Sequence, residues 1–87
     1  MPKIEMYSTA VCPYCTAAKN LLKSKGLEWS ETRIDTDPVA FDAMRTRSGG
    51  RRTVPQIFIN GAHVGGFDDL AKAERDGTLA RLLDPQA

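Results

Sequence analysis

Polar and apolar residues alternate at the start of the chain and then change to a helical spacing. In residues 3–7, Lys-Ile-Glu-Met-Tyr, the period of two predicts a β-strand. Beyond Pro13, which suits the first position of a helix, apolar residues recur on one helical face until Gly26. The residues that share this face are Ala17, Ala18, Leu21 and Leu22. The pattern therefore predicts a strand followed by a helix.

The middle of the chain repeats this order with weaker signals. Residues 27–34 are the second strand candidate, although their alternation is poor. Asp37 followed by Pro38 is typical of a helix start, because aspartate accepts hydrogen bonds from the first N–H groups of a helix. Gly49-Gly50 ends this second helix. The residues expected to be buried along it are Ala40, Phe41 and Met44.

The last third of the chain predicts a β-hairpin followed by two helices. Residues 54–59 are a β-rich run, Asn60-Gly61 is a two-residue hairpin turn, and residues 62–64 return as the partner strand. The two helices carry apolar stripes at Leu70, Ala71 and Ala73 and at Leu79, Leu82 and Leu83.

Turn and cap residues separate these last elements. Gly65-Gly66 breaks the hairpin, and Asp68 or Asp69 is expected to cap the third helix, which ends near Gly77. Thr78 is expected to cap the fourth helix.

The element order is β-α-β-α-β-β-α-α, which predicts an α/β fold. A strand–helix–strand unit implies a right-handed parallel crossover, and the hairpin implies an antiparallel pair. We therefore expect one domain, residues 1–87, built on a four-stranded mixed sheet with helices on both faces.

Composition excludes several classes of function. The 87 residues carry a formal net charge of +1, whereas a general nucleic-acid binder needs a strongly basic face. No apolar run approaches the roughly 20 residues of a membrane span. Glu5 interrupts the first apolar stretch, so no secretory leader is expected. We expect a cytoplasmic protein without nucleic-acid or membrane partners.

The two cysteines, Cys12 and Cys15, are the strongest chemical signal. A disulfide across so short a loop adds little stability, so the pair is expected to be catalytic or metal-binding. Cys12 falls at a helix N-terminus, where unpaired N–H groups favour a thiolate, and Cys15 is close enough to form a disulfide with it. Zinc needs four ligands and only His63 could join them, so no metal site is expected.

Three segments of the sequence resemble the dithiol glutaredoxins in order and spacing. They are Cys12-Pro13-Tyr14-Cys15, Thr53-Val54-Pro55 and Gly65-Gly66-Phe67-Asp68-Asp69. The resemblance covers nearly the whole chain and implies a thioredoxin-like fold. It makes Cys12 the attacking thiol and Cys15 the resolving thiol, with Pro13, Tyr14 and a cis Pro55 shaping the active site.

The same resemblance implies a binding site for glutathione. The Val54 backbone would pair with the cysteinyl part like an added strand. The N–H groups of Phe67 and Asp68 would hold the γ-glutamyl carboxylate, and the Asp69 side chain its ammonium. Arg47 would meet the glycyl carboxylate. The implied glutathione-binding residues are, in full, Arg47, Thr53, Val54, Gly66, Phe67, Asp68 and Asp69.

The implied activity is glutathione-dependent reduction of protein disulfides and of glutathione mixed disulfides. Glutathione would be a reducing co-substrate, with no permanently bound cofactor. The implied partners are glutathione, glutathionylated or disulfide-containing proteins and, indirectly, glutathione reductase with NADPH. The resemblance also implies that the protein is a monomer, that it takes part in electron transport, and that it helps to maintain the redox homeostasis of the cell.

Two residues depart from the family pattern, and two other functions stay open. Thr9 stands where many relatives have lysine, so the thiolate would depend more on the helix N-terminus; Phe67 stands where several have cysteine.

One alternative function is that of a redoxin reduced by thioredoxin reductase, against which the second and third motifs argue. The other is a carrier of a glutathione-ligated [2Fe–2S] cluster between two monomers, which Pro13 and Tyr14 disfavour.

Overall fold

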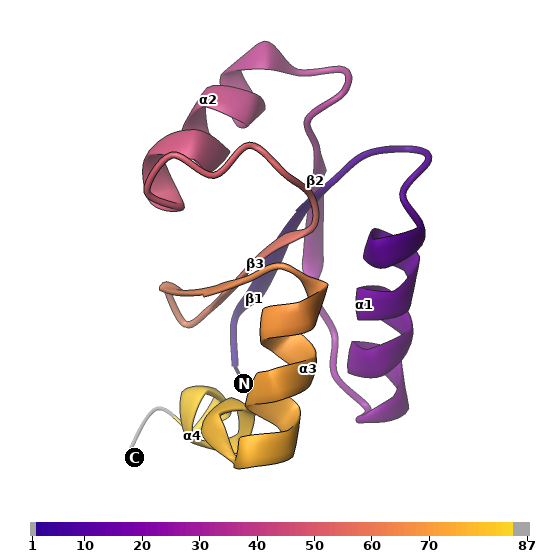
Figure 1. The fold of residues 1–87 in the computed structure, drawn as a ribbon, viewed down its shortest axis with the longest axis vertical. Helices are drawn as coiled ribbons and strands as arrows, with labels where there is room; N and C mark the ends of the chain where they lie inside the picture. The colour runs from indigo at the N-terminus through magenta and orange to yellow at the C-terminus, as the bar shows by residue number, and fades with distance from the viewer. Residues whose placement is uncertain (1, 85–87) are drawn as a thin grey trace.

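The computed structural model describes residues 2–84, which contain four strands and four helices in the predicted order (Figure 1). The strands are β1 (Ile4–Ser8), β2 (Ser30–Arg33), β3 (Gln56–Ile59) and β4 (Ala62–Gly65). The helices are α1 (Pro13–Ser24), α2 (Pro38–Arg47), α3 (Phe67–Asp76) and α4 (Thr78–Leu83). The predicted domain also includes Met1 and residues 85–87, which lie outside the described residues.

The strands form one mixed sheet in the order β2-β1-β3-β4. β1 is parallel to β2, because α1 provides the crossover that parallel neighbours need. β1 is antiparallel to β3, and β3 is antiparallel to β4. The turn between β3 and β4 consists of Asn60 and Gly61, whose φ angles of 51° and 86° are typical of a tight hairpin. The predicted four-stranded mixed sheet is confirmed.

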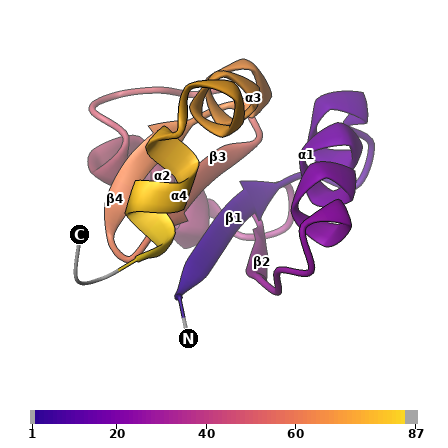
Figure 2. The same ribbon diagram turned by 90° about the horizontal axis from the view of Figure 1, so that it is seen from below.

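Helices cover both faces of this sheet (Figure 2) because side chains alternate along the central strands. The larger cluster contains Ile4, Met6, Ile57 and Ile59 from the strands and Ala18, Leu22, Leu70, Ala73 and Leu79 from α1, α3 and α4. The smaller cluster contains Tyr7 and Phe58 from the strands and Ala40 and Met44 from α2. Phe41, predicted to be buried, is only half-buried. It follows Ala40 directly in the sequence, so its side chain points about 100° further around the helix than that of the buried Ala40.

The second strand is shorter than predicted. β2 covers Ser30–Arg33 rather than residues 27–34, because Leu27 and Trp29 pack against the core before β2 begins. All four residues of β2 are exposed at the edge of the sheet, which explains why the alternation in this segment is poor.

The predicted caps of the last two helices are wrong by one to three residues. α3 begins at Phe67 with Gly66 as its N-cap residue, so Asp68 and Asp69 lie inside its first turn. α4 begins at Thr78 itself, directly after Gly77. In both cases a glycine directly precedes the helix, and the expected capping residue lies within the first turn.

Within residues 2–84, no helix combines the length and the hydropathy that crossing a membrane requires.

Candidate active site

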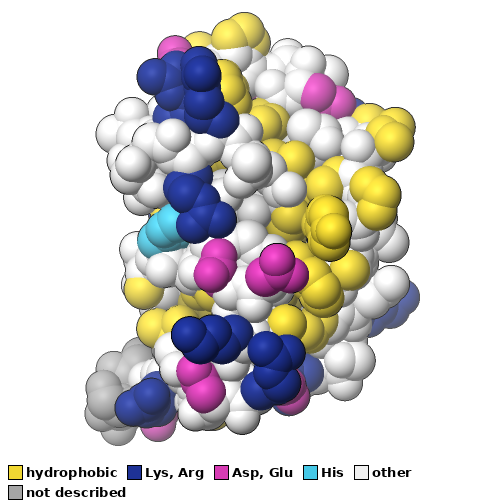
Figure 3. Space-filling view, in the orientation of Figure 1, with side chains coloured by type: hydrophobic (Ala, Val, Ile, Leu, Met, Phe, Trp, Pro, Cys, Tyr) yellow, Lys and Arg dark blue, Asp and Glu magenta, His cyan; other side chains and the backbone are white. Residues whose placement is uncertain are grey.

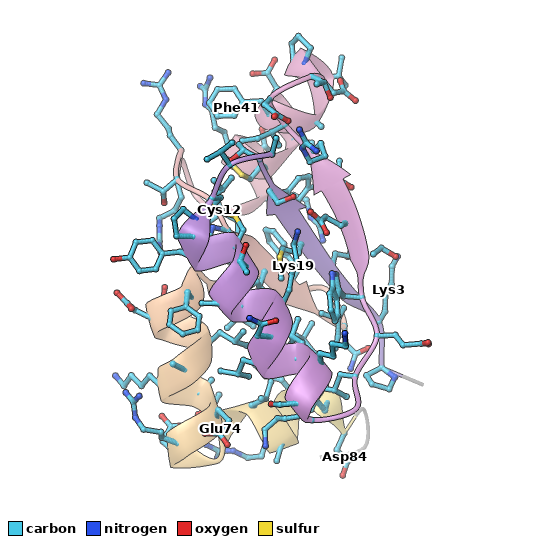
Figure 4. The ribbon with its side chains drawn as sticks, turned by 90° about the vertical axis from the view of Figure 1, so that its right-hand side faces the viewer. Lys3, Cys12, Lys19, Phe41, Glu74 and Asp84 are labelled. Atoms are coloured by element: carbon cyan, nitrogen blue, oxygen red, sulfur yellow. A yellow bond between two sulfur atoms is a disulfide. The ribbon has the colours of Figure 1, made fainter. Side chains whose placement is uncertain are left out.

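The two cysteines lie at the junction of β1 and α1 (Figure 4). Cys12 is the N-cap residue of α1, and its Sγ accepts a hydrogen bond from the Cys15 N–H at 3.1 Å. Pro13 occupies the first turn of α1, as predicted. The two cysteines form a disulfide, with their Cα atoms 5.1 Å apart. The pair therefore lies at a helix N-terminus, which is the electrostatic setting that favours a thiolate.

The two sulfur-bearing residues differ in exposure. Cys15 is only 1% exposed, whereas Cys12 is partly exposed. Val11 and Tyr14 flank Cys12 with large exposed apolar side chains. An attacking thiol must reach a bulky disulfide, while a resolving thiol needs to reach only the first sulfur. This arrangement suits Cys12 to attack and Cys15 to resolve.

The segment before β3 lies next to Cys12. The Val54–Pro55 peptide bond is cis, as the resemblance implied, and the Val54 carbonyl oxygen lies 3.8 Å from Cys12 Sγ. β3 begins at Gln56 rather than at Val54, because Pro55 has no N–H to donate to a neighbouring strand. The Val54 backbone therefore lies outside the sheet and beside the sulfur, where an extended ligand could pair with it.

The glycine pair shapes the entry to α3. Gly65 has a φ of +120°, a conformation that side chains other than glycine rarely adopt. Gly66 has no side chain to cap the first N–H groups of α3, which include those of Phe67 and Asp68. Asp69 turns back, and its Oδ2 accepts a hydrogen bond from the Gly66 N–H at 3.0 Å. The start of α3 is therefore suited to bind an anion.

A cavity of about 330 Å³ lies between these segments. The residues that line it are Tyr14, Arg51, Thr53, Val54, Pro55, Gly66, Phe67, Asp68 and Asp69. The rings of Tyr14 and Phe67 are stacked, with centroids 6.4 Å apart. Figure 3 shows apolar side chains gathered on the face that carries α1 and α3, with acidic and basic groups beside them. The structure thus brings together every predicted glutathione-binding residue except Arg47.

Arg47, which the resemblance implied would meet the glycyl carboxylate, makes its contacts elsewhere in the structure. Its guanidinium pairs with Glu5 at 3.1 Å, donates to the Tyr7 hydroxyl at 3.1 Å and lies over the Phe58 ring. The Arg47 hydrogen bond is the main reason why the pKa of Glu5 lies below its ordinary value. Among the described residues, the set that lines the cavity does not include Arg47.

Arg51 lines the cavity instead, and sequence reasoning missed it. Its Nη2 lies 3.4 Å from Asp69 Oδ2, so a cation and an anion stand side by side in the site. Both side chains are about half exposed, at 46% and 47%. A ligand that carries charges of both signs could therefore pair with both residues.

Asp35 fixes the loop that leads to Cys12, and no sequence signal identified it. Its Oδ2 accepts a hydrogen bond from the Ala10 N–H at 3.1 Å, and both its oxygens accept hydrogen bonds from Arg33, at 2.9 and 2.6 Å. These contacts, chiefly those with Arg33, lower the pKa of Asp35 to about 2. The carboxylate thus joins the loop before Cys12 to the segment after β2.

We expect Arg33→Ala to raise the pKa of Asp35 towards its ordinary value. A depressed pKa in the folded state means that Asp35 stabilises the fold above about pH 4 and stops doing so as the pH falls towards 2. Carbon-13 NMR titration of the carboxyl groups measures this. Arg45→Ala, which removes the ion pair with Asp42, is the matched control and should leave Asp35 unchanged. An Asp35 that titrates at its ordinary pKa in the parent protein would contradict this account.

Metal-binding side chains are not clustered in residues 2–84: no three histidine, cysteine or acidic side chains gather there in a way that could hold an ion. His63, on β4, contacts Gln56 at 2.7 Å, and partial desolvation of this otherwise exposed side chain lowers its pKa.

Comparison with known sequences points to one family. The family model for glutaredoxin matches residues 4–64. A glutaredoxin from Neisseria meningitidis serogroup A is 48% identical over 86 residues, covering 98% of this chain and 100% of that protein. Glutaredoxin 3 from Escherichia coli K12 is 47% identical over 83 residues, covering 95% and 99%.

Solved structures with the same fold have the same family name. The solution structure of a glutaredoxin from Brucella melitensis has a TM-score of 0.82 and 44% identity, covering 98% of this chain and 91% of that one. The crystal structure of a buckwheat glutaredoxin–glutathione complex has a TM-score of 0.82 and 31% identity, covering 92% and 74%. The chain therefore belongs to the glutaredoxin family of thiol–disulfide oxidoreductases and has their thioredoxin-like fold.

Proposed function

We propose that this protein uses glutathione to reduce glutathione mixed disulfides and protein disulfides through Cys12. The observation that carries the proposal is the cavity beside Cys12. Its lining combines the backbone of Val54, which lies outside the sheet, an acidic side chain at Asp69 and the N-terminal end of α3. Glutathione is a tripeptide with one ammonium and two carboxylates, so it can use each of these groups. The glutathione complex of the buckwheat relative adds support.

In the proposed complex, the cysteinyl part of glutathione lies along Val54. The Val54 N–H and C=O pair with it as a neighbouring strand would, which directs the ligand sulfur to Cys12. The γ-glutamyl carboxylate meets the first N–H groups of α3, at Phe67 and Asp68. The γ-glutamyl ammonium meets the Asp69 carboxylate.

The glycyl carboxylate is assigned in this proposal to Arg51 rather than to Arg47. Arg51 lines the cavity, whereas Arg47 is engaged with Glu5, Tyr7 and Phe58. To bind the ligand, Arg47 would have to give up its ion pair with Glu5 and its contact with the Phe58 ring. Thr9 brings no charge to the site, so Arg51 is the cation that this cavity offers the ligand.

The reaction with a glutathionylated protein needs Cys12 alone. The Cys12 thiolate attacks the glutathione sulfur, a new S–S bond forms, and the protein thiolate leaves and takes up a proton. A second glutathione thiolate then attacks the glutathione sulfur on Cys12, which releases glutathione disulfide and restores the Cys12 thiolate. The net reaction converts the glutathionylated protein and one free glutathione into the protein thiol and glutathione disulfide, which glutathione reductase returns to two glutathione molecules with NADPH.

The reaction with a protein disulfide uses both cysteines. Cys12 attacks and forms a mixed disulfide with the substrate, and Cys15 then attacks Cys12 and releases the reduced substrate. The Cys12–Cys15 disulfide, which is the state seen in the structure, is then reduced by two glutathione molecules. The reaction requires a compartment rich in reduced glutathione, so we propose that the protein acts in the cytoplasm, as a monomer.

The first test is turnover of a small glutathione mixed disulfide in the presence of glutathione, glutathione reductase and NADPH. We expect NADPH oxidation at a rate proportional to protein concentration and above the rate with glutathione alone. A folded, reduced protein without such a rate would contradict the proposal. Coupling to thioredoxin reductase, and visible absorption after anaerobic iron–sulfur reconstitution, would then distinguish the two alternative functions.

A further inference from the structure

Gln56 has a polar side chain that is fully buried, and the residue before it, Pro55, lines the cavity. Gln56 is the first residue of β3, follows Pro55, and has a relative exposure of 0%. A buried amide is stable only when both its nitrogen and its oxygen have hydrogen-bond partners. The sequence pattern gave no reason for a glutamine in an otherwise apolar strand, so its partners reveal what it does.

The Gln56 nitrogen holds Thr53. Nε2 donates to the Thr53 carbonyl oxygen at 3.0 Å and to the Thr53 Oγ1 at 3.2 Å. These bonds span the cis Val54–Pro55 bond from one end to the other. Thr53 and Val54 both line the cavity, and the Val54 oxygen is 3.8 Å from Cys12 Sγ. The amide therefore fixes the segment whose backbone faces the reacting sulfur.

The Gln56 oxygen is held in turn by His63. Oε1 lies 2.7 Å from His63 Nε2. The Thr53 carbonyl can only accept a hydrogen bond, so the amide nitrogen must face it and the amide oxygen must face His63. An oxygen only accepts, so His63 Nε2 must carry the proton. The three residues thus have one consistent set of donors and acceptors.

Both Gln56 and His63 belong to strands of the sheet. Gln56 pairs with Tyr7 in the antiparallel ladder between β3 and β1, and β4 supplies His63 from the other side. The segment from Thr53 to Pro55 has no ladder of its own, because β3 starts only at Gln56. Its orientation therefore depends on side-chain hydrogen bonds to the sheet.

We infer that Gln56 is a positioning residue that holds the Thr53–Val54 backbone ready to bind the glutathione part of a mixed disulfide, with His63 fixing the orientation of the Gln56 amide. The inference rests on the proposed function. Gln56 does not touch the reacting sulfur, so its loss should weaken binding of the glutathione part and leave the intrinsic reactivity of Cys12 unchanged.

The test compares Gln56→Met and Gln56→Glu with the parent on two substrates. Methionine matches glutamine in length but donates no hydrogen bond, and glutamate keeps the oxygen towards His63 while losing both donors to Thr53. One substrate is a small glutathione mixed disulfide, for which KM and kcat are measured separately. The other is dithiodipyridine, a disulfide without a glutathione part, for which the rate with Cys12 is measured.

We expect both variants to raise KM for the glutathione mixed disulfide about five- to tenfold, the effect of losing hydrogen bonds to a buried amide. The values of kcat and the dithiodipyridine rate should stay within about twofold of the parent. His63→Leu alters an exposed position and should raise KM less, because the amide then loses only its orienting partner. This third variant carries the test if the Gln56 variants do not fold.

Two results would overturn the inference. An unchanged KM in all folded variants would show that the Gln56 amide does not position the binding segment. An equal loss on both substrates would show that Gln56 supports the fold or Cys12 itself. A parent that reacts with dithiodipyridine but does not turn over the glutathione substrate would instead refute the proposed function, and this inference with it.

Discussion

Cys12→Ser is expected to reduce turnover of a glutathione mixed disulfide to the rate of glutathione alone, whereas Cys15→Ser should keep turnover at the same order of magnitude. Serine at position 12 cannot form the mixed disulfide through which the reaction passes, because its hydroxyl is neither ionised at neutral pH nor able to bond to sulfur in this way. Cys15 takes no part in this branch, since glutathione itself attacks the second sulfur.

With a protein disulfide as substrate, the same two variants distinguish the reaction that needs both cysteines from the reaction that needs Cys12 alone. With a protein disulfide, Cys15→Ser should accumulate a mixed disulfide between Cys12 and the substrate, which mass spectrometry detects, because the buried Cys15 thiol no longer resolves it. Circular dichroism of both variants serves as the control for folding. A Cys15→Ser variant that is inactive on the small substrate, with Cys12→Ser active, would reverse the roles assigned to the two cysteines.

Much of this site could be predicted from local sequence alone. The cysteine pair at the start of α1 follows from an alternating strand and a proline at the first helical position, both of which are local signals. The hairpin at Asn60-Gly61 is equally local, because a two-residue turn with positive φ angles needs these residue types. Where the conformation of a short segment depends on its own residues, the sequence was sufficient to predict it.

Contacts between distant segments could not be predicted from the sequence. Arg47 and Arg51 lie four positions apart around the end of α2, so only the packed structure shows that the first reaches Glu5 and the second reaches Asp69. Asp35 binds Ala10 across 25 positions, and a sequence pattern cannot show such a pairing. The N-cap predictions failed for a related reason: glycine, aspartate and threonine all occur as N-cap residues, and Gly66 and Gly77 lie within three positions of the polar candidates, so the sequence does not decide between them.

Gly65→Ala is expected to be strongly destabilising and to impair turnover, whereas Gly77→Ala should cost less and leave turnover unchanged. The two glycines flank α3 at its opposite ends, and both have positive φ angles, +120° and +87°. At Gly77 an added Cβ meets nothing within 4 Å, so the variant should lose only the about 1–2 kcal/mol of a left-handed backbone.

At Gly65 the added Cβ would have no room. It would lie 2.7 Å from Asp69 Cγ and 2.9 Å from Asp69 Cβ, both shorter than real contacts allow. We therefore expect a further loss of about 1–3 kcal/mol from overpacking, in addition to the backbone cost. Because the Asp69 carboxylate would have to leave the Gly66 N–H, KM for a glutathione mixed disulfide should rise as well.

Urea unfolding of both glycine variants and turnover of the folded protein measure these effects. The difference between the two variants contains the close contact with Asp69 and the larger backbone cost of a φ of +120° compared with +87°. Equal free energies of unfolding for the two variants would show that Asp69 moves aside without cost. A Gly65→Ala variant of unchanged KM would show that the ammonium of the substrate does not depend on the position of the Asp69 carboxylate, and that part of the proposed binding mode would then be wrong.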